Sequence, residues 1–589
     1  MKQKRTYYLL MPLKASALCV WGILFLQGIQ ALIPSAFAVL TASIVNHTGD
    51  IMRLGSIEVI LPQLYVLFLL ILFQFNGNTL QSLLYTQLRT RIRECFEQEI
   101  LKKISMLPYS AMEDSGTYEL INRIAKTYDV RITDGFRTYL RAGGNALQLL
   151  SVLWLILAAG AWRSAVVLLL FSIPLAAVSI RGGKRNYDAS VQAAAGEQRA
   201  AYLNEVLLGG EAVLERGFFG FSGWMQEKWS ILYNGAQQLR YHARARAIIR
   251  MKLSSIFTVF ASMIVCGMLV SPLLRGQMSL GTFFGLTTAI FHFVTLVSWE
   301  IADTFDQLAQ GRAYCTDLAG FFALEETDTG SGEPWRLPGI REIVFENVSF
   351  RYPGCENYVL RNVNMTLQHD KHYAIVGING AGKSTLMKLM CGLYTDYEGT
   401  IRINGNDIRT IPYNELRRYF SIAWQNFARY QIPLNEYLKL SGETEENAFW
   451  ELLRLFEMDG TVASWQNGLQ TPLGKLKENG QEVSQGQWQR LMLVKTLLQK
   501  GAVKVFDEPT SAIDPVGESR LYDRIAGWTK GKLTLFITHR LGAARMADEI
   551  LVLDQGTVAE KGSHQELIRL QGLYAEMYNT QREWYVNGK

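Results

Sequence analysis

The stretch from Gly377 to Thr385 reads Gly-Ile-Asn-Gly-Ala-Gly-Lys-Ser-Thr, and it restricts the surrounding fold more than any other part of the chain. It follows the apolar run Tyr373–Val376, which is typical of a short buried strand, and it precedes Leu386–Met390, which is typical of the start of a helix. A strand, the spacing GxxxxGKS and a helix in this order are the context that a phosphate-binding P-loop requires. The sequence therefore predicts an α/β domain that binds ATP or GTP.

The residue types in this loop suit a polyphosphate ligand. Glycines let the backbone fold tightly enough for successive N–H groups to face the phosphates, and the helix that follows adds the positive end of its dipole. We expect Lys383 to reach the β- and γ-phosphates and Ser384 to hold Mg²⁺. The other loop residues that we expect at the nucleotide are Asn379, Gly380, Ala381, Gly382 and Thr385.

A second candidate stretch, Val503-Lys504-Val505-Phe506-Asp507-Glu508, is an apolar strand that ends in two carboxylates. In the same α/β unit as a P-loop, this ending predicts that Asp507 holds Mg²⁺ through water and that Glu508 orients and deprotonates the attacking water. Lys504 is unexpected inside such a strand. We interpret it as lying at a partly exposed face, or as reaching water by extending its side chain.

The first half of the 589-residue chain has a different character, because long apolar runs alternate with basic segments up to about Asp306. The chain is too long for one domain. A window of about 19 residues finds six apolar segments that could span a membrane, and an even number puts both ends on one side. The six predicted spans are Ala17–Val45, Ile57–Gln81, Ala142–Trp162, Ala165–Ile180, Ser254–Leu274 and Leu280–Glu300.

The basic residues between the apolar runs predict the topology. They gather from Arg89 to Arg141 and from Arg181 to Lys252, so both segments should be cytoplasmic. Both are nearly free of Pro and run directly into the spans, and we therefore expect spans two to five to continue as helices beyond the bilayer. The net charge of +6 has this explanation, and no feature indicates nucleic acid as a partner. Six scattered cysteines indicate neither a disulfide framework nor a metal site.

Several amide and imidazole side chains lie inside the predicted spans. Unpaired polar groups in hydrocarbon are costly, so they tend to face a bundle interior or a cavity. Hydrogen bonds between helices and the lining of a substrate cavity both explain them, and the sequence leaves both readings open. The candidate cavity residues are Gln27, Gln30, Gln74, Asn78, Gln148 and His292.

Taken together, these features resemble the ATP-binding cassette (ABC) transporters, and specifically the exporter-type half-transporters, in which one transmembrane domain is fused to one nucleotide-binding domain. The resemblance covers essentially the whole chain. It implies a multi-domain fold: an all-α, six-span transmembrane domain of the ABC exporter type at residues 1–310, a linker at 311–340, and an α/β P-loop nucleotide-binding domain at 341–589.

The resemblance also implies roles for residues outside the P-loop. Tyr352 looks like the aromatic that stacks on adenine, and Gln425 looks like the glutamine that touches Mg²⁺ and senses the membrane domain. His539 looks like the switch histidine on the γ-phosphate, so that Glu508, His539 and Gln425 form the expected catalytic set. The segment Asp114–Leu120 resembles the first short cytoplasmic helix of exporters.

Val483-Ser484-Gln485-Gly486-Gln487 resembles the signature sequence that caps the ATP of the partner subunit, so Ser484, Gly486 and Gln487 are expected at that nucleotide. The stretch departs from the commonest form at Val483 and Gln485 but retains Ser484 and Gly486. Asp514 resembles the aspartate of the loop that communicates between the two ATP sites. Asp370 stands where the family usually turns with Gly, which we expect to be tolerated.

The resemblance implies ATP-driven export of an amphipathic compound, such as a modified peptide, drug or lipid, by alternating access in a dimer with ATP and Mg²⁺ as cofactors. A single copy of every element requires a second half-transporter; we favour a homodimer, and a heterodimer is the main rival. The alternatives are import of a metal chelate on the same fold, and an ATP-gated channel or regulator that does not pump stoichiometrically. The expected location is the cytoplasmic (inner) cell membrane, with the nucleotide-binding domain in the cytoplasm.

Overall fold

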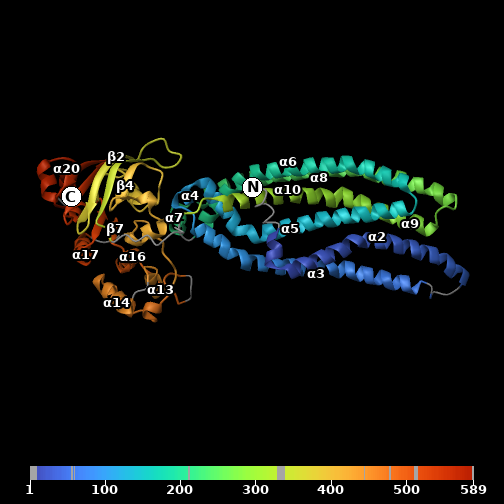
Figure 1. Ribbon diagram of the computed structural model, residues 1–589, viewed down its shortest axis with the longest axis horizontal. Helices are drawn as coiled ribbons and strands as arrows, with labels where there is room; N and C mark the ends of the chain where they lie inside the picture. Colours follow the sequence, from blue (N-terminus) through green and yellow to red (C-terminus); the bar gives the residue numbers. More distant parts are fainter. Residues whose placement is uncertain are drawn as a thin grey trace. The chain divides into compact units, whose positions relative to one another are not determined.

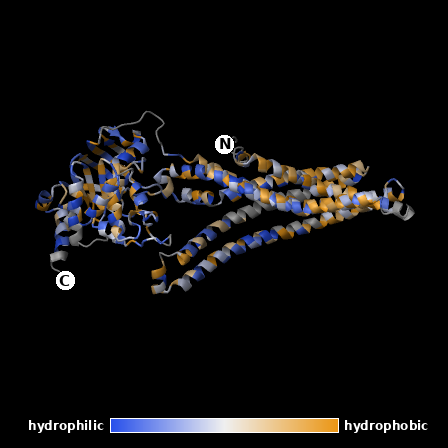
Figure 2. Cartoon of the chain, turned by 90° about the horizontal axis from the view of Figure 1, so that it is seen from below, coloured by the Kyte–Doolittle hydropathy of each residue, from blue (hydrophilic) through white to orange (hydrophobic). Residues whose placement is uncertain are grey.

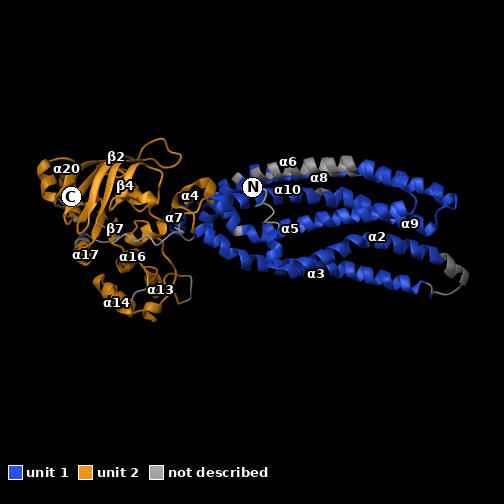
Figure 3. Ribbon diagram, viewed as in Figure 1, with its two compact units in different colours: residues 1–105, 119–324 blue, residues 106–118, 325–589 orange. Residues whose placement is uncertain are grey.

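The computed structural model describes residues 10–54, 58, 60–209, 212–327, 339–442, 445–475, 479–509 and 515–586. It divides into two compact units, drawn in different colours in Figure 3. Unit 1 comprises residues 1–105 and 119–324, and unit 2 comprises residues 106–118 and 325–589. A short piece of the first half, residues 106–118, therefore packs with the C-terminal unit.

The described part of unit 1 is helical. Its elements are α2 (Ala17–Leu54), α3 (Leu61–Ser105), α5 (Ser115–Ala158), α6 (Trp162–Leu208), α7 (Val213–Phe219), α8 (Ser222–Leu274), α9 (Leu280–Thr295), the π-helical turn η2 (Leu296–Glu300) and α10 (Ile301–Ala323). The long helices lie side by side (Figure 1), with α6 against α8 and α2 against both α3 and α9.

Four of these helices are far longer than a bilayer is thick. Helices α3, α5, α6 and α8 have 45, 44, 47 and 53 residues. At about 1.5 Å per residue they are roughly 65 to 80 Å long, whereas the hydrocarbon core of a membrane measures about 30 Å. These lengths are what helices that continue beyond the bilayer require, and the extension of spans two to five beyond the membrane stays a prediction.

Within the described residues, five helices are long and apolar enough to cross a membrane, and each overlaps one of the predicted spans: Ala17–Thr48, Leu61–Ser105, Thr127–Ala158, Ile256–Leu274 and Leu280–Ala323. The fourth predicted span, Ala165–Ile180, lies on α6. There the described apolar stretch is Trp162–Ser172, and the side chains of residues 173–188 lie outside the described part. Apolar residues gather in the halves of the helices toward the α5–α6 and α8–α9 connections (Figure 2).

Small residues bring α2 and α9 into close contact. A Cβ atom at Gly281 would lie 2.1 Å from the carbonyl oxygen of Ala42, and one at Gly285 would lie 2.5 Å from that of Ala38. The side chain of Asn46 also accepts a hydrogen bond from the Gly281 N–H at 2.9 Å. Such close backbone approach is how membrane helices gain packing energy without a hydrophobic driving force between them.

The described part of unit 2 contains two sheets. The strands are β1 (Glu342–Phe350), β2 (Leu360–Gln368), β3 (His372–Val376), β4 (Glu398–Ile403), β5 (Asn406–Asp407), β6 (Phe420–Ala423), β7 (Val503–Asp507), β8 (Leu533–Ile537), β9 (Glu549–Asp554) and β10 (Thr557–Gly562). One sheet has the order β10-β9-β3-β8-β7-β6 and is parallel except for β10. The other is antiparallel with the order β2-β1-β4-β5.

Short helices surround these sheets: α4 (Tyr109–Glu113), α11 (Lys383–Met390), α12 (Tyr413–Leu416), α13 (Leu434–Lys439), α14 (Glu446–Leu455), α15 (Asp459–Ala463), α16 (Gln485–Leu498), α17 (Pro515–Trp528), α18 (Leu541–Ala544), α19 (His564–Leu570) and α20 (Leu573–Val586). Three 3₁₀ turns accompany them, η3 (Ile408–Thr410), η4 (Arg417–Tyr419) and η5 (Gly468–Gln470).

The larger sheet is what positions the site. Strands β3, β7 and β8 are buried at nearly every position, as expected of parallel strands covered on both faces. An apolar core that draws residues from both sheets surrounds α11. Because the carboxyl ends of parallel strands meet at one edge, the loops that follow β3, β6, β7 and β8 gather there.

The predicted linker at 311–340 differs from the structure in its first part, because α10 continues to Ala323. Leu318 and Phe321 on this stretch are buried, which holds it against the bundle as helix. Residues 324–327 have no regular secondary structure, and residues 328–338 lie outside the described part of the chain.

Candidate functional site

The P-loop connects β3 to α11, as the motif predicts. Lys383 is the first residue of α11 and is buried. Its ammonium group reaches back across the loop and donates hydrogen bonds to the carbonyl oxygens of Gly377 at 2.8 Å and Ile378 at 3.0 Å. Burial lowers the pKa of Lys383, while the carboxylates of Glu508 and Asp507 oppose that shift. A positive charge is thus held inside the curve of a loop whose residues Asn379 and Gly380 are exposed.

Two glycines in this loop cannot be replaced without moving its neighbours. Gly382, which precedes α11, has φ of +99°, and a Cβ there would lie 2.7 Å from the Leu360 side chain. A Cβ at Gly377 would lie 2.2 Å from the carbonyl oxygen of Leu553. The left-handed conformation and the close backbone approach both favour glycine. The buried Ala381 lies between them and fixes the loop against the core.

Asp507 and Ser384 meet beside the P-loop. Asp507 ends β7 and is buried, and the Ser384 hydroxyl donates to its Oδ2 at 3.5 Å. Burial and then the adjacent charge of Glu508 raise the pKa of Asp507 to about 6, against the opposing effects of Ser384 and Lys383. A buried carboxylate next to a hydroxyl is a set of hard oxygen donors of the kind that Mg²⁺ prefers.

Glu508 is the centre of the site. Its Oε2 accepts a hydrogen bond from Gln425 Nε2 at 2.7 Å, and its Oε1 lies 3.0 Å from Nδ1 of His539. Its backbone has φ of +47°, a left-handed conformation that is uncommon for a residue with a side chain. The N–H of Glu508 donates to the carbonyl oxygen of Ile537 at 2.9 Å, which keeps this turn in place.

The three predicted catalytic residues therefore lie in direct contact, although they come from separate loops of the chain. Gln425 follows β6, Glu508 follows β7 and His539 follows β8. The sheet order places β7 between β6 and β8, so the central carboxylate lies between the amide and the imidazole. Such an arrangement can orient a water molecule and accept its proton.

Tyr352 lies next to α11. Its hydroxyl group shares a hydrogen bond of 2.9 Å with the Thr385 hydroxyl, and its ring contacts those of Phe350 and Tyr394 edge-on. The ring is packed on one side by other aromatics, so it presents a fixed surface beside the P-loop. Its predicted role in stacking on adenine stays a prediction.

The predicted signature residues form the start of α16. Ser484 is the N-cap: its Oγ accepts from the Gln487 N–H at 3.3 Å, and the Gln487 side chain accepts from the Ser484 N–H at 2.9 Å. This capping box leaves Ser484 exposed at the positive end of a 14-residue helix, with Gly486 in its first turn. No hydrogen bond joins Ser484 to Lys383 among the described residues of this single chain. Asp514 lies outside the described residues.

A cluster that the sequence analysis did not predict joins α4 to α11. The Lys388 ammonium group donates to Glu113 Oε1 at 3.1 Å, and the hydroxyl groups of Tyr109 and Tyr394 donate to the same carboxylate. Lys388 also lies 5.0 Å from the Tyr109 ring centre and 5.6 Å from that of Tyr352. The segment 106–118 is thereby attached to the P-loop helix and to the candidate adenine-stacking residue.

Gln581, on α20, is a second residue that the sequence did not reveal. Its Oε1 accepts the Leu541 N–H at 2.9 Å, and its Nε2 donates to the carbonyl oxygen of His539 at 2.5 Å. The side-chain amide of Gln581 thus bonds to the backbone of the residues before and after Arg540, and it fixes the turn that carries the His539 imidazole. Gln581 lies more than forty residues from His539 in the sequence, and no sequence motif surrounds it that could have identified it.

We expect Gln581→Met to lower kcat for ATP by about tenfold and to leave KM within about twofold, because His539 keeps its chemistry but loses its fixed position. Gln581→Glu, which retains the acceptor oxygen and removes the N–H donor, should have an intermediate effect. Arg582→Met, at the exposed neighbouring position, is the matched control. Steady-state ATPase kinetics measure all three, and equal kcat values for the wild-type chain and Gln581→Met would contradict this role.

Three of the six candidate cavity residues of the membrane half form hydrogen bonds between helices. Gln81 Nε2 donates to Gln27 Oε1 at 2.7 Å, and Gln30 Nε2 donates to Asn78 Oδ1 at 3.1 Å, so two amide pairs join α2 to α3. The remaining candidates differ in the exposure of their side chains: Gln74 is exposed on α3, while Gln148 and His292 are half-buried. Their role at a substrate stays a prediction.

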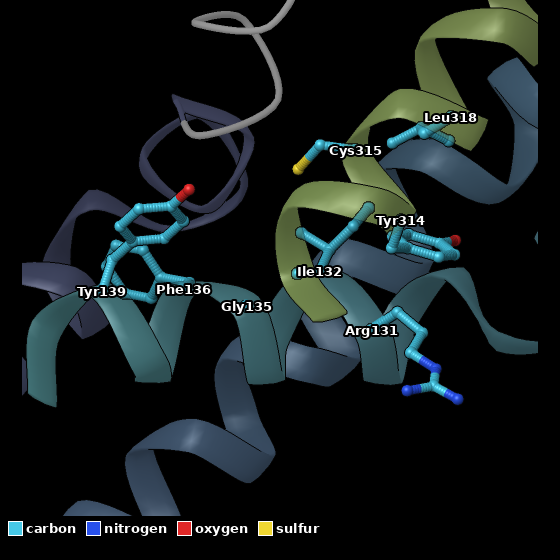
Figure 4. Close-up of a pocket in the computed structure, with 9 residues that line it drawn as sticks. Arg131, Ile132, Gly135, Phe136, Tyr139, Tyr314, Cys315 and Leu318 are labelled. Carbon is cyan, nitrogen blue, oxygen red and sulfur yellow. The ribbon is translucent and has the colours of Figure 1, made fainter. Parts of the chain in front are cut away.

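The structure contains a pocket between α5 and α10 that includes none of the six candidate cavity residues (Figure 4). Its lining residues are Arg131, Ile132, Gly135, Phe136, Tyr139, Gly311, Tyr314, Cys315 and Leu318. Phe136 and Tyr139 lie on one side of it and Cys315 on the other (Figure 4). A Cβ at Gly311 would lie 3.8 Å from the Gly135 Cα, so the helices approach closely beside the pocket.

Comparison with known proteins finds similarity to transport proteins. Residues 360–511 match the model of the ABC transporter family. The subtilin transport ATP-binding protein SpaT of Bacillus subtilis is 26% identical, with 83% of this chain and 80% of that protein aligned. The ATP-dependent lipid A-core flippase of Photobacterium profundum is 29% identical over 81% of this chain and 80% of that protein. The structure of a bacterial Atm1-family ABC exporter with ATP bound superposes with a TM-score of 0.80 at 20% identity, covering 96% of this chain and 99% of that one.

Proposed function

We propose that this chain, an ATP-binding cassette half-transporter with the exporter fold, uses ATP hydrolysis to export an amphipathic compound across a membrane. The observation that carries the proposal is the contact of Glu508 with both Gln425 and His539 beside the P-loop. A transporter that only bound ATP as a signal would not need a carboxylate held by two other side chains at the place where water must attack.

The proposed chemistry follows from these positions. Lys383 binds the β- and γ-phosphates, and Glu508 accepts a proton from the attacking water. Gln425 and His539 hold the two carboxylate oxygens of Glu508, so the base is oriented before ATP arrives. When ATP binds, we expect phosphate oxygens to replace the Gly377 carbonyl oxygen as a partner of the Lys383 ammonium group.

Ser384 and Asp507 would hold Mg²⁺, with Gln425 as a further candidate ligand. Their fit rests on the 3.5 Å contact between the Ser384 hydroxyl and the Asp507 carboxylate, and on the burial that raises the pKa of Asp507. A cation at this position would favour the ionised carboxylate. When bound, the ion neutralises charge on the phosphate oxygens during hydrolysis.

The working form that we propose is a dimer with two ATP molecules at its interface. One chain supplies Lys383, and Ser484 with the N-terminus of α16 comes from the other chain. ATP then favours the closed pair, and hydrolysis removes the phosphate that bridges it. Because Lys383, Glu508, His539 and Ser484 are all present in this chain, two identical copies would form two complete sites, which supports a homodimer over a heterodimer.

The proposed location is the cytoplasmic membrane, with unit 2 in the cytoplasm. The chain is a multi-pass membrane protein, and its basic segments, Arg89–Arg141 and Arg181–Lys252, lie between apolar spans. The rule that short basic loops remain inside supports this orientation.

The substrate class that we propose is an amphipathic peptide or a lipid-like molecule. Two relatives support it by name, one a subtilin transport protein and one a lipid A-core flippase. The amide pairs between α2 and α3 add support, because polar groups within an apolar bundle can exchange their partners with a ligand that has both polar and apolar parts.

The test uses the full chain in sealed vesicles with unit 2 facing outward. We expect ATP to drive accumulation of an amphipathic peptide, or flipping of a fluorescent lipid, against a gradient, and we expect the substrate to stimulate ATP hydrolysis. The Glu508→Gln variant in identical vesicles is the control. A passive channel would equilibrate the solute without stoichiometric ATP consumption, and an importer would move it in the opposite direction.

A further inference from the structure

Among the residues that the structure describes, Lys504 is the most deeply buried charged side chain that the proposed mechanism does not use. It lies on β7, three residues before Asp507, and its relative exposure is 0%. The prediction that it lies at a partly exposed face or extends to water is therefore wrong. An ammonium group far from water is costly unless oxygen atoms surround it.

Three oxygen atoms surround this ammonium group. Lys504 Nζ donates to the Ser421 hydroxyl oxygen at 3.0 Å and to the carbonyl oxygens of Thr496, at 3.1 Å, and Gln499. An ammonium group has three N–H donors, so every donor has an acceptor. Among the described residues, no carboxylate lies within ion-pair distance of Nζ; this lysine is held by neutral oxygens.

These acceptors belong to two different elements, β6 and α16. Ser421 lies on β6, and Thr496 and Gln499 lie at the carboxyl end of α16, where backbone carbonyl groups lack partners within the helix. A cation at this end also complements the negative end of the helix dipole. The Ser421 hydroxyl itself donates to the Gln499 carbonyl at 3.2 Å, which closes the cluster.

The opposite ends of the same three elements carry the site. Helix α16 begins after Ser484, β6 leads to Gln425, and β7 leads to Asp507 and Glu508. A change in the angle between α16 and the sheet at Lys504 would therefore be magnified at Ser484, fourteen helical residues away and about 20 Å along the axis.

We propose that Lys504 is a positioning residue for ATP hydrolysis, because its ammonium group fastens the end of α16 to β6 and β7 and so fixes where Ser484 meets the nucleotide. This proposal rests on the function proposed above. Lys504 touches neither ATP nor the reacting water, and it acts through the orientation of α16.

The test compares Lys504→Met, which fills the same space without any donor, with the wild-type chain. Lys500→Met, at an exposed position four residues earlier, removes the same charge and is the matched control. Ser421→Ala removes one acceptor from the same cluster and changes the buried volume very little. It serves as the second variant if Lys504→Met does not fold.

We expect Lys504→Met to lower kcat for ATP about tenfold and Ser421→Ala to lower it by a smaller factor in the same direction. Binding of a fluorescent ATP analogue in EDTA, which reports the P-loop alone, should remain within about twofold of wild type. A loss of turnover together with an equal loss of P-loop binding would overturn the proposal in favour of general destabilisation, and unchanged kcat in both variants would also overturn it. Hydrolysis by the wild-type chain and its absence in Glu508→Gln test the proposed function separately.

A pH series gives a readout that a purely structural lysine would not produce. Burial and the nearby charge of Lys532 lower the pKa of Lys504 to about 7. Between that value and the ordinary lysine pKa near 10.5, the unfolded chain binds more protons than the folded one, so the free energy of unfolding rises with pH. The neutral amine has only two donors, however, and leaves one acceptor of the cluster without its bond.

Relative to Lys504→Met, the wild-type chain should therefore become more stable and less active as the pH rises from 7 to 9. Melting temperature and kcat, each expressed as the difference between wild type and variant, measure the two trends. Taking this difference removes the pH dependence of stability and kcat that comes from titratable groups present in both proteins, such as His539. A rise of activity together with stability would contradict the positioning role.

Discussion

Glu508→Gln should lower ATP turnover by roughly a hundredfold to ten-thousandfold, the range that general-base catalysis supplies, while ATP remains bound. The glutamine amide has nearly the same shape as the carboxylate, so the contact with Gln425 can be retained. It cannot accept the proton of the attacking water. The prediction is therefore a trapped state: ATP binds and favours the closed dimer, and the step that would reopen it does not occur.

Steady-state ATPase assays and the amount of ATP retained after gel filtration measure this effect. Glu451→Gln, an exposed carboxamide substitution on α14, is the matched control and should behave as wild type. If Glu508→Gln hydrolysed ATP and moved substrate at the wild-type rate, another residue would have to be the base. Release of ATP by the variant would instead place the defect in binding.

The P-loop is predictable because everything that defines it is local. Positive φ at Gly382, a lysine at the first position of a helix and a buried strand before it all follow from nine consecutive residues and their neighbours. Asp370 illustrates the same point: it has φ of +61°, and aspartate tolerates this conformation better than most residues do. Backbone conformation that depends on neighbouring residues can be predicted from the local sequence.

The contacts around Glu508 are different, because they depend on the order of strands in the sheet. Family resemblance indicated Gln425 and His539 as functional residues, but only the β6-β7-β8 order places one on each side of the carboxylate. The sequence contains no signal for that order. The residue Gln581 could not be identified for the same reason, since its bonds join the last helix to a loop forty residues earlier.

Lys504 was misinterpreted because burial of a charge depends on partners that are distant in sequence. A lysine in an apolar strand suggests exposure, and that rule fails only when oxygens converge on it. Here one hydroxyl on β6 and two carbonyls at the end of α16 do so. The linker was misjudged similarly, since the burial of Leu318 and Phe321 on the bundle extends α10 past the predicted boundary.

The second large effect tests whether each ATP is shared between two chains. Lys383→Ala removes the positive charge that would bind the phosphates, and Ser484→Arg blocks the start of α16. Homodimers of either variant should lose at least about tenfold in ATPase activity. Two mixed dimers, purified through different tags on the two chains, then contain the same substitutions in different arrangements. In the first, one chain carries Lys383→Ala and the other carries Ser484→Arg. In the second, one chain carries both substitutions and its partner is wild type.

If Lys383 of one chain and Ser484 of the other bind the same ATP, the first dimer keeps one intact site, because its Ser484→Arg chain supplies Lys383 and its Lys383→Ala chain supplies Ser484. The second dimer then has one damaged residue in each site, and we expect it to be inactive. If both residues of one chain acted on the same ATP, the order would reverse, because the wild-type chain of the second dimer would work alone. Since composition and total charge are identical, a difference in ATP hydrolysis between the two dimers depends only on which chain completes which site.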